Sequence, residues 1–209
     1  MKTYKFKNVK INQIEISLLI GLMTAIFCCF GNIIKDSENL SSKILRLHII
    51  PNSNSNTDQN MKMKLKNAIL NKFNFDNYSH NITLAKQKIK TKLNEIEAYS
   101  QNFLKNQGYN LPVKASLEKT EFHTRKYENF ALPAGTYNAL KIQIGKAKGK
   151  NWWCIFVPAM CVPAASKTKN KISKILNSNQ QNLIQKGSKN EIRFAAIEIF
   201  EKIKKTITK

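Results

Sequence analysis

The sequence predicts an α+β domain, a small antiparallel sheet of about four strands with helices packed on one face, preceded by an N-terminal signal or anchor helix. Segments with a period of two, which indicates strands, occur at 44–50, 113–123, 137–144 and 152–157. Segments with a helical period occur at about 58–70, 82–107 and 188–209. The last three strands follow one another through short links, which predicts an antiparallel meander. Strands and helices grouped in separate runs are typical of this fold class.

The N-terminus begins with a basic flank and continues as an apolar run. Four lysines lie within the first ten residues, and the stretch from Ile16 to Ile34 carries no charge. This order is typical of a secretory signal, and the run is also long enough for an uncleaved anchor. We therefore predict export, with residues 1–34 as a signal peptide or membrane anchor that makes transient membrane contact through residues 16–34.

The remaining chain divides into an α/β domain at 35–163, a polar loop at 164–187 and a C-terminal amphipathic helix at 188–209. Residues 36–42 are expected to be a polar junction before the first strand. The loop is rich in Lys, Ser, Asn and Gln, which favours mobility with one or two helical turns at most.

The first strand alternates in a way that predicts one buried and one outer face. Leu45, Leu47 and Ile49 point one way, and Arg46 and His48 point the other. His48 is therefore interpreted as a hydrogen-bonded structural residue on the polar face.

The chain is strongly basic, with a formal net charge of +22 over 209 residues. Nearly all basic residues are lysines, and the arginines are Arg46, Arg125 and Arg193. Proteins that read base edges rely on the bidentate fork of arginine, so the composition argues against nucleic acid as a partner. The charge is interpreted as a solvated surface, with attraction to anionic lipid or wall polymer left open.

A glycine-rich basic loop at 145–151 lies between the last two predicted strands. A phosphate-binding loop needs four residues between its glycines, then Lys and Ser/Thr, then a helix. Here the glycines are closer together, Asn151 replaces the hydroxyl and a strand follows. The loop is therefore predicted to be a basic hairpin tip.

Two tryptophans and a cysteine pair follow that loop. Successive strand residues point to opposite faces, so Trp152 and Trp153 could divide between the core and an exposed binding surface, or both could lie in the core. Cys154 and Cys161 are close enough in sequence to form a disulfide after export, which would constrain the unfolded chain by roughly 2.5 kcal/mol. Two free thiols are the alternative.

No set of residues indicates catalysis, a metal site or a cofactor. The carboxylates show no paired pattern for hydrolysis. A thiol nucleophile formed by Cys154 with His48 or His123 has no local support. The residues alone leave three classes open: an exported interaction protein, an exported cell-wall-active or thiol-dependent enzyme, and a basic polyanion-binding surface protein.

Three blocks of the sequence resemble the stage II sporulation protein R family. They are LRLHIIPNSN at 45–54, DQNMKMKLKNAIL at 58–70 and LPAGTYNALKIQIGKAKGKNWWCIFVPAMC at 132–161. Pro51 and Asn54 stand where the family usually has Ala and Asp. Where the family reads Phe-Pro-Pro-Leu-Cys, this chain has Val-Pro-Ala-Met-Cys at 157–161, so one proline of that bend is missing.

The resemblance implies a signalling protein of endospore formers and no enzymatic activity. Such a protein is made in the forespore and exported to the space between the two membranes. There it activates the sigma E processing peptidase, a membrane-embedded aspartic protease of the mother cell, which processes pro-sigma E. We hypothesise that Lys150, Asn151, Trp152, Trp153 and Pro158 contact this protease.

Overall fold

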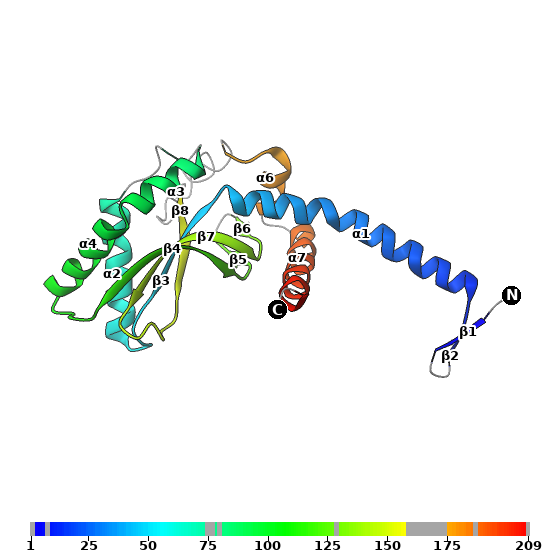
Figure 1. Ribbon diagram of the computed structural model, residues 1–209, viewed down its shortest axis with the longest axis horizontal. Coiled ribbons are helices and arrows are strands. Elements are labelled where there is room, and N and C mark those ends of the chain that lie inside the picture. The colour runs from blue at the N-terminus through cyan, green and yellow to red at the C-terminus, as the bar shows by residue number, and fades with distance from the viewer. Residues whose placement is uncertain are drawn as a thin grey trace.

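A computed structural model describes residues 3–6, 9–73, 78, 81–127, 130–157, 175–185 and 188–207. Figure 1 shows a domain built on one sheet, from which the N-terminal half of a long helix projects. A short antiparallel hairpin precedes that helix and consists of β1 (Thr3–Phe6) and β2 (Val9–Asn12). The predicted α+β class is confirmed.

The central sheet has four strands in the order β4-β7-β3-β8. Their bounds are β3 Leu45–Ile50, β4 Val113–Phe122, β7 Gly135–Ile144 and β8 Trp152–Val157. β4 pairs with β7 antiparallel, β7 pairs with β3 parallel, and β3 pairs with β8 antiparallel. The sheet is therefore mixed, and the prediction of a purely antiparallel meander is wrong.

The reason for this order is that β3 lies between β7 and β8. The link at 145–151 does not turn β8 back onto β7, so the prediction that this loop is a hairpin tip is wrong. It passes the end of β3 and places β8 on the other side. Periodicity identifies strands and their faces, but not which strand lies beside which.

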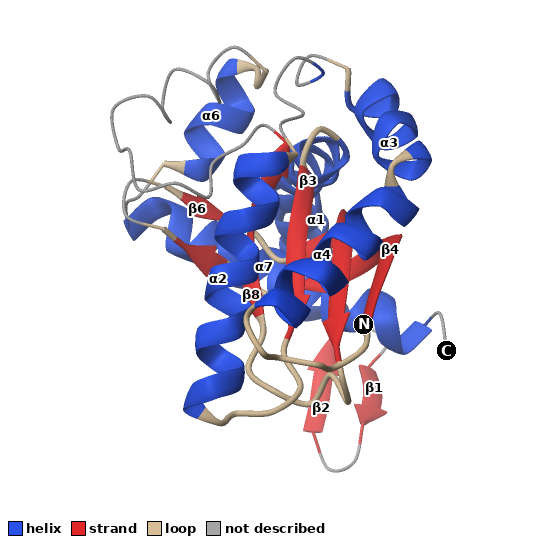
Figure 2. Ribbon diagram, turned by 90° about the vertical axis from the view of Figure 1, so that its left-hand side faces the viewer, coloured by secondary structure: helices blue, strands red, loops and turns tan. Residues whose placement is uncertain are grey.

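Helices cover both faces of the sheet, and the prediction that they pack on one face is also wrong. On one face lie α2 (Asn56–Lys72), α3 (Ile82–Thr91) and α4 (Leu93–Asn106); Figure 2 shows α2 and α4 in front of the strands. The first core cluster lies between these helices and the sheet and includes Leu65, Ile89, Ile96 and Leu104. On the other face lie the end of α1 (Gln13–Ser42), α6 (Ser178–Ile184) and α7 (Ser188–Ile207).

The second face explains why the first strand differs from its alternation pattern. Five of the six residues of β3 are buried, and Arg46 and His48 are among them. The face that the sequence predicts to be polar is thus covered near Arg46 by the second core cluster, which includes Leu40, Tyr137, Ile155 and Ile197.

The predicted polar junction at 36–42 is helical, because α1 continues without a break to Ser42. Ser37 and Leu40 are buried, and Ile33 packs against the second core cluster. The last three turns of α1 therefore belong to the folded domain. The first half is exposed and apolar, and α1 is the one helix within the described ranges that is long and apolar enough to cross a bilayer; signal sequences share these properties.

The remaining elements complete the domain. The predicted helix at 82–107 is two helices, α3 and α4, with a break at Lys92. Between β4 and β7 lies a small hairpin of β5 (Arg125–Lys126) and β6 (Ala131–Leu132). Within the predicted polar loop, α6 provides the helical turns expected there, and residues 164–174 lie outside the described residues. The C-terminal helix is confirmed from Ser188.

Candidate interaction surface

Two of the three sequence blocks lie side by side in the sheet. β3 carries the first block and β8 carries the end of the third. Their register places Ile49 opposite Trp152, His48 opposite Trp153 and Leu47 opposite Cys154. The loops that follow β3 and precede β8 therefore meet at the same end of the sheet.

Backbone hydrogen bonds join these two loops. The Gly149 amide donates to the Pro51 carbonyl at 3.0 Å, and the Lys148 amide donates to the Asn52 carbonyl at 3.1 Å. Close approach makes a glycine necessary at 149, because a Cβ there would lie 2.1 Å from the Ser53 carbonyl oxygen.

Asparagine side chains complete the junction. The Asn52 Oδ1 accepts a hydrogen bond from the Lys146 amide at 3.0 Å, and the Asn54 Oδ1 accepts one from the Lys150 amide at 2.7 Å. The amides of this loop are thus used within the protein, whereas a phosphate cradle must point its amides at the ligand. The structure agrees with the prediction that this is not a phosphate-binding loop.

Asp58, in the first turn of α2, accepts hydrogen bonds that hold the same junction. Its carboxylate accepts hydrogen bonds from the Tyr109 hydroxyl at 2.6 Å and from the Asn52 Nδ2 at 2.9 Å. Burial alone would raise the pKa of Asp58, but hydrogen bonds from Ser53, Tyr109 and Asn52 outweigh burial and lower the pKa to about 2. Asp58 is therefore ionised under all ordinary conditions and holds the β3–α2 loop in place.

Two lysines of α2 contact the predicted binding segment. The Lys62 Nζ donates to the Lys150 carbonyl at 2.9 Å, and the Lys66 Nζ lies 4.8 Å from the centre of the Trp152 ring. Both lysines are buried, and burial lowers the pKa of each. Trp152 is half-buried against the first core cluster, and its Nε1 has no hydrogen-bond partner.

Trp153 lies on the opposite face and stacks on His48. The two ring centres are 3.7 Å apart, and Phe122 meets Trp153 edge-on at 4.6 Å. His48 is 4% exposed, and neither ring nitrogen has a hydrogen-bond partner, unlike the hydrogen-bonded role predicted for it. Burial, with a contribution from the positive charge of Lys141, lowers its pKa to about 4, and the nearby Asn151 side chain opposes that shift.

A row of four side chains crosses the whole sheet on this face. Ser116 lies opposite Lys141, Lys141 opposite His48, and His48 opposite Trp153. We call these four residues the open row, because all except His48 are partly exposed. Glu118, two residues further along β4, forms an ion pair with Lys141.

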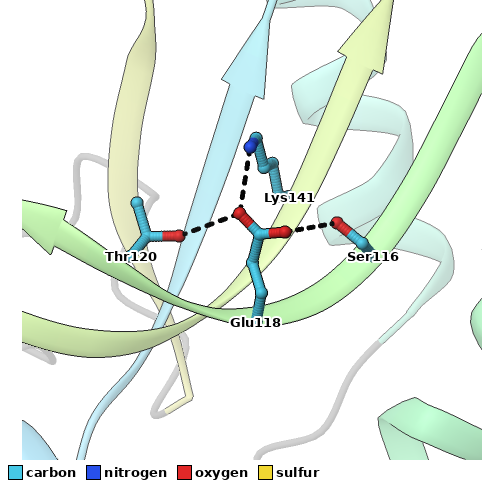
Figure 3. Close-up of polar contacts among 4 residues, drawn as sticks. All are labelled: Ser116, Glu118, Thr120 and Lys141. Atoms are coloured by element: carbon cyan, nitrogen blue, oxygen red, sulfur yellow. Dashed lines mark hydrogen bonds and ion pairs between the residues drawn. The ribbon is translucent and has the colours of Figure 1, made fainter.

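Figure 3 shows this ion pair and its neighbours. The Lys141 Nζ lies 2.9 Å from the Glu118 Oε1, while Ser116 and Thr120 donate to the same carboxylate at 3.2 and 3.5 Å. The hydrogen bond from Lys141 is the main reason that the pKa of Glu118 is lowered. Lys141 of the open row and the neighbouring Glu118 therefore form an ion pair on the same face as the partly exposed indole of Trp153.

Arg46 lies under the covered part of the same face and is fully buried. Its Nη2 donates to the Tyr127 hydroxyl at 3.0 Å, and its Cζ lies 3.8 Å from the centre of the Phe122 ring. Its Nε and Nη1 have no hydrogen-bond partner. Burial lowers the pKa of this guanidinium, and the aromatic rings supply cation–π contacts in place of a carboxylate.

The predicted contact residues thus fall into three groups. Lys150 and Asn151 are exposed in the loop before β8. Trp152 and Trp153 are both half-buried and pack on opposite faces, so neither ring stands free. Pro158 lies outside the described residues. Sequence reasoning missed Lys141 and Ser116, because their alignment with Trp153 depends on the parallel pairing of β3 and β7.

The cysteines bear on the remaining alternatives. Cys154 is buried in the first core cluster, whereas His48 lies on the opposite face of the sheet. These two residues therefore do not form the thiol–imidazole pair that a cysteine nucleophile needs. Cys161 lies outside the described residues, and its disulfide with Cys154 stays a prediction.

Comparison with known proteins gives one consistent result. The family model described as stage II sporulation protein R matches residues 41–167. Stage II sporulation protein R of Bacillus subtilis (strain 168) is 34% identical over 132 residues, which is 60% of this chain and 58% of that protein. No solved structure matches this chain.

Proposed function

Because this chain belongs to the stage II sporulation protein R family, we propose that it is an exported sporulation signal that activates a membrane-embedded aspartic protease of the mother cell. That protease then processes pro-sigma E. Membership of the family assigns the chain a role in sporulation. The protease, the precursor and the space between forespore and mother cell belong to the proposal.

The observation that carries the proposal is the position of the matched blocks in the fold. The matched region contains the sheet and α2 to α4. Its first and third blocks interlock at one end of the sheet, beside the exposed Lys150 and Asn151 and the open row. A rigid, exposed corner with a half-exposed tryptophan is what a protein that works by touching a receptor requires.

Activation sets an energetic requirement for this surface. The signal must bind the active state of the protease better than the inactive state. Moving a balance of one to ninety-nine completely across takes about 5.5 kcal/mol of differential affinity. One aromatic anchor and two charged contacts of about 2 kcal/mol each would supply that amount, and we assign these contacts to Trp153, Lys141 and Lys150.

The test is co-expression with the candidate protease and its precursor substrate in a host that lacks both. Cleavage of the precursor should require this chain. The substitutions Lys150→Ala and Asn151→Ala, both at exposed positions, should together reduce the rate of cleavage about tenfold or more. Lys105→Ala, at an exposed position on α4, is the matched control and should leave the rate unchanged.

The tryptophans need a folding control, because both indoles pack against core clusters. A Trp152→Ala/Trp153→Ala protein that keeps its circular dichroism spectrum and still triggers processing would remove this segment from the proposed interface. Cleavage without this chain, or conversion of the precursor by this chain alone, would overturn the proposed function itself.

We also propose the disulfide between Cys154 and Cys161. Support comes from the apolar, signal-like helix α1 and from the burial of Cys154 within β8, seven residues before Cys161. Peptide mass mapping of the exported protein without reductant should show the two cysteines linked. Recovery of both as alkylated thiols would refute the pairing.

A further inference from the structure

The C-terminal helix α7 carries apolar side chains on the side that faces away from the domain. Its buried apolar side chains are Phe194 and Ile197. Four isoleucines on the opposite side are exposed by 53 to 78% and form what we call the α7 stripe: Ile192, Ile199, Ile203 and Ile207. Four large apolar side chains aligned along one exposed helix face are unusual on a protein surface that meets only water.

The sequence already indicates that these side chains share a face. Ile192, Ile199 and Ile203 recur with a helical period, which predicts one face of an amphipathic helix. The structure places Phe194 and Ile197 inward and leaves the stripe uncovered. The stripe therefore has a length and a spacing suited to a second apolar environment.

The neighbouring helix α1 indicates what that environment is. The charge-free part of α1, Ile16 to Ile34, extends about 28 Å, and the hydrocarbon core of a bilayer is about 30 Å thick. Side chains along it, such as Leu18 and Met23, are exposed by 68 and 65%. From Ser17 to Ala25 every side chain of α1 is exposed, whereas Ile33, near the end of this stretch, packs against the second core cluster.

An ion pair joins α7 to α1 at one level along the axis of α1. The Lys204 Nζ of α7 lies 2.8 Å from the Glu38 Oε1 of α1. Glu38 follows Ile34 by one helical turn, about 6 Å, and the headgroup layer of a bilayer is also about 6 Å thick. When Ile16–Ile34 spans the hydrocarbon core, α7 therefore lies at the level of the headgroups.

The orientation of α7 agrees with that level. In Figure 1 α7 forms the border of the domain on the side from which the free half of α1 projects. In Figure 2, turned by 90°, α7 extends sideways toward the C-terminus, across the direction of α1. A helix that crosses the spanning helix runs along the membrane plane, and the α7 stripe, which faces away from the domain core, faces the bilayer.

We propose that α7 lies flat on the membrane surface, with the α7 stripe inserted at the boundary between headgroups and acyl chains. Amphipathic helices bind anionic bilayers in this way when lysines border the apolar face. Lys202 lies on the exposed part of α7 beside the stripe, and the chain as a whole carries +22. A second copy of this chain could also cover the stripe, but it would not explain the shared level of α7 and α1.

This inference rests on α1 entering a bilayer and does not depend on which receptor is bound. It adds a second membrane contact to the one through residues 16–34. The domain would then be held in one orientation relative to the membrane, with α7 as a second contact beside α1.

The test uses the full chain in vesicles of phosphatidylglycerol and phosphatidylethanolamine. A photoreactive diazirine amino acid is placed at position 203 on the stripe, at position 18 in α1, or at position 105 on α4. After illumination, mass spectrometry identifies adducts with lipid or with protein. We expect lipid adducts at positions 18 and 203, none at position 105, and loss of the adduct at 203 when Ile199→Asp is added.

The other outcomes each overturn the proposal and can be told apart. Lipid adducts at position 18 alone would show that α1 enters the bilayer while α7 does not. A crosslink between two copies at position 203 would assign the stripe to self-association. The absence of lipid adducts at both 18 and 203 would show that α1 itself stays outside. Ile199 is 58% exposed, so Ile199→Asp should leave the circular dichroism spectrum unchanged.

Discussion

Mild acid should destabilise this protein mainly through His48. Its imidazole is 4% exposed, stacks on Trp153 and has no hydrogen-bond partner for either nitrogen. Burial, with the charge of Lys141, lowers its pKa from 6.5 to about 4. Because the folded state binds this proton less well than the unfolded state, stability is complete above pH 6.5 and is lost as the pH falls toward 4.

The magnitude follows from the two pKa values. Between pH ~7.5 and ~5 the unfolded imidazole becomes almost fully protonated, while the folded one stays mostly neutral. This difference lowers the free energy of unfolding by about 2 kcal/mol. In urea, with a slope of roughly 2 kcal/mol per molar, the midpoint should fall by about 1 M.

The assay is urea unfolding of the full chain in a mild detergent, followed by tryptophan fluorescence at both pH values. His48→Phe keeps an aromatic ring beside Trp153 but cannot be protonated, so its midpoint should fall by about 1 M less than that of the wild type. His123→Phe, at an exposed position, is the matched control and should fall as the wild type does. Equal falls in wild type and His48→Phe would refute the reasoning.

Three further predictions concern the buried polar groups and the loop junction. Gly149→Ala places a Cβ 2.1 Å from a carbonyl oxygen, so thermal unfolding should show a loss of about 2–4 kcal/mol, against about 1 kcal/mol for Gly108→Ala, where only the positive φ matters. Asp58→Asn removes the charge that accepts from Tyr109 and should cost about 2 kcal/mol, measured at neutral pH; because the folded pKa of Asp58 is lowered to about 2, that difference should shrink as the pH falls from 4 toward 2. Arg46→Met removes a buried, largely unpaired charge and should leave the urea midpoint unchanged or raise it; a loss above ~2 kcal/mol would contradict this view of Arg46.

Local patterns were sufficient for most of the longer elements of this fold. The apolar helix at the N-terminus, α2, the four sheet strands and α7 all lie where the period of the sequence predicts them. Each of these signals comes from residues that are close together in the chain. The same signals located the loop at 145–151 and the tryptophans beside it.

The arrangement of those elements could not be read in this way. Insertion of β3 between β7 and β8 depends on contacts between distant segments. The burial of Arg46 and His48 on a face that alternation predicts to be polar depends on them too, because residues from distant helices and strands cover that face. For the same reason, Lys141 and Ser116 gave no sign that they share a row with Trp153. The break at Lys92 has no glycine or proline to mark it.

The position of β3 in the chain also bears on the proposed export. Both partners of this strand, and the loop that locks over its end, come from far downstream; Asn52 and Lys146, for example, are separated by 94 residues. The middle of the sheet therefore cannot form until most of the polypeptide has been synthesised, and such distant pairings close slowly. The export proposed above requires a chain that is still unfolded when it crosses a membrane, and a sheet that closes late meets that requirement.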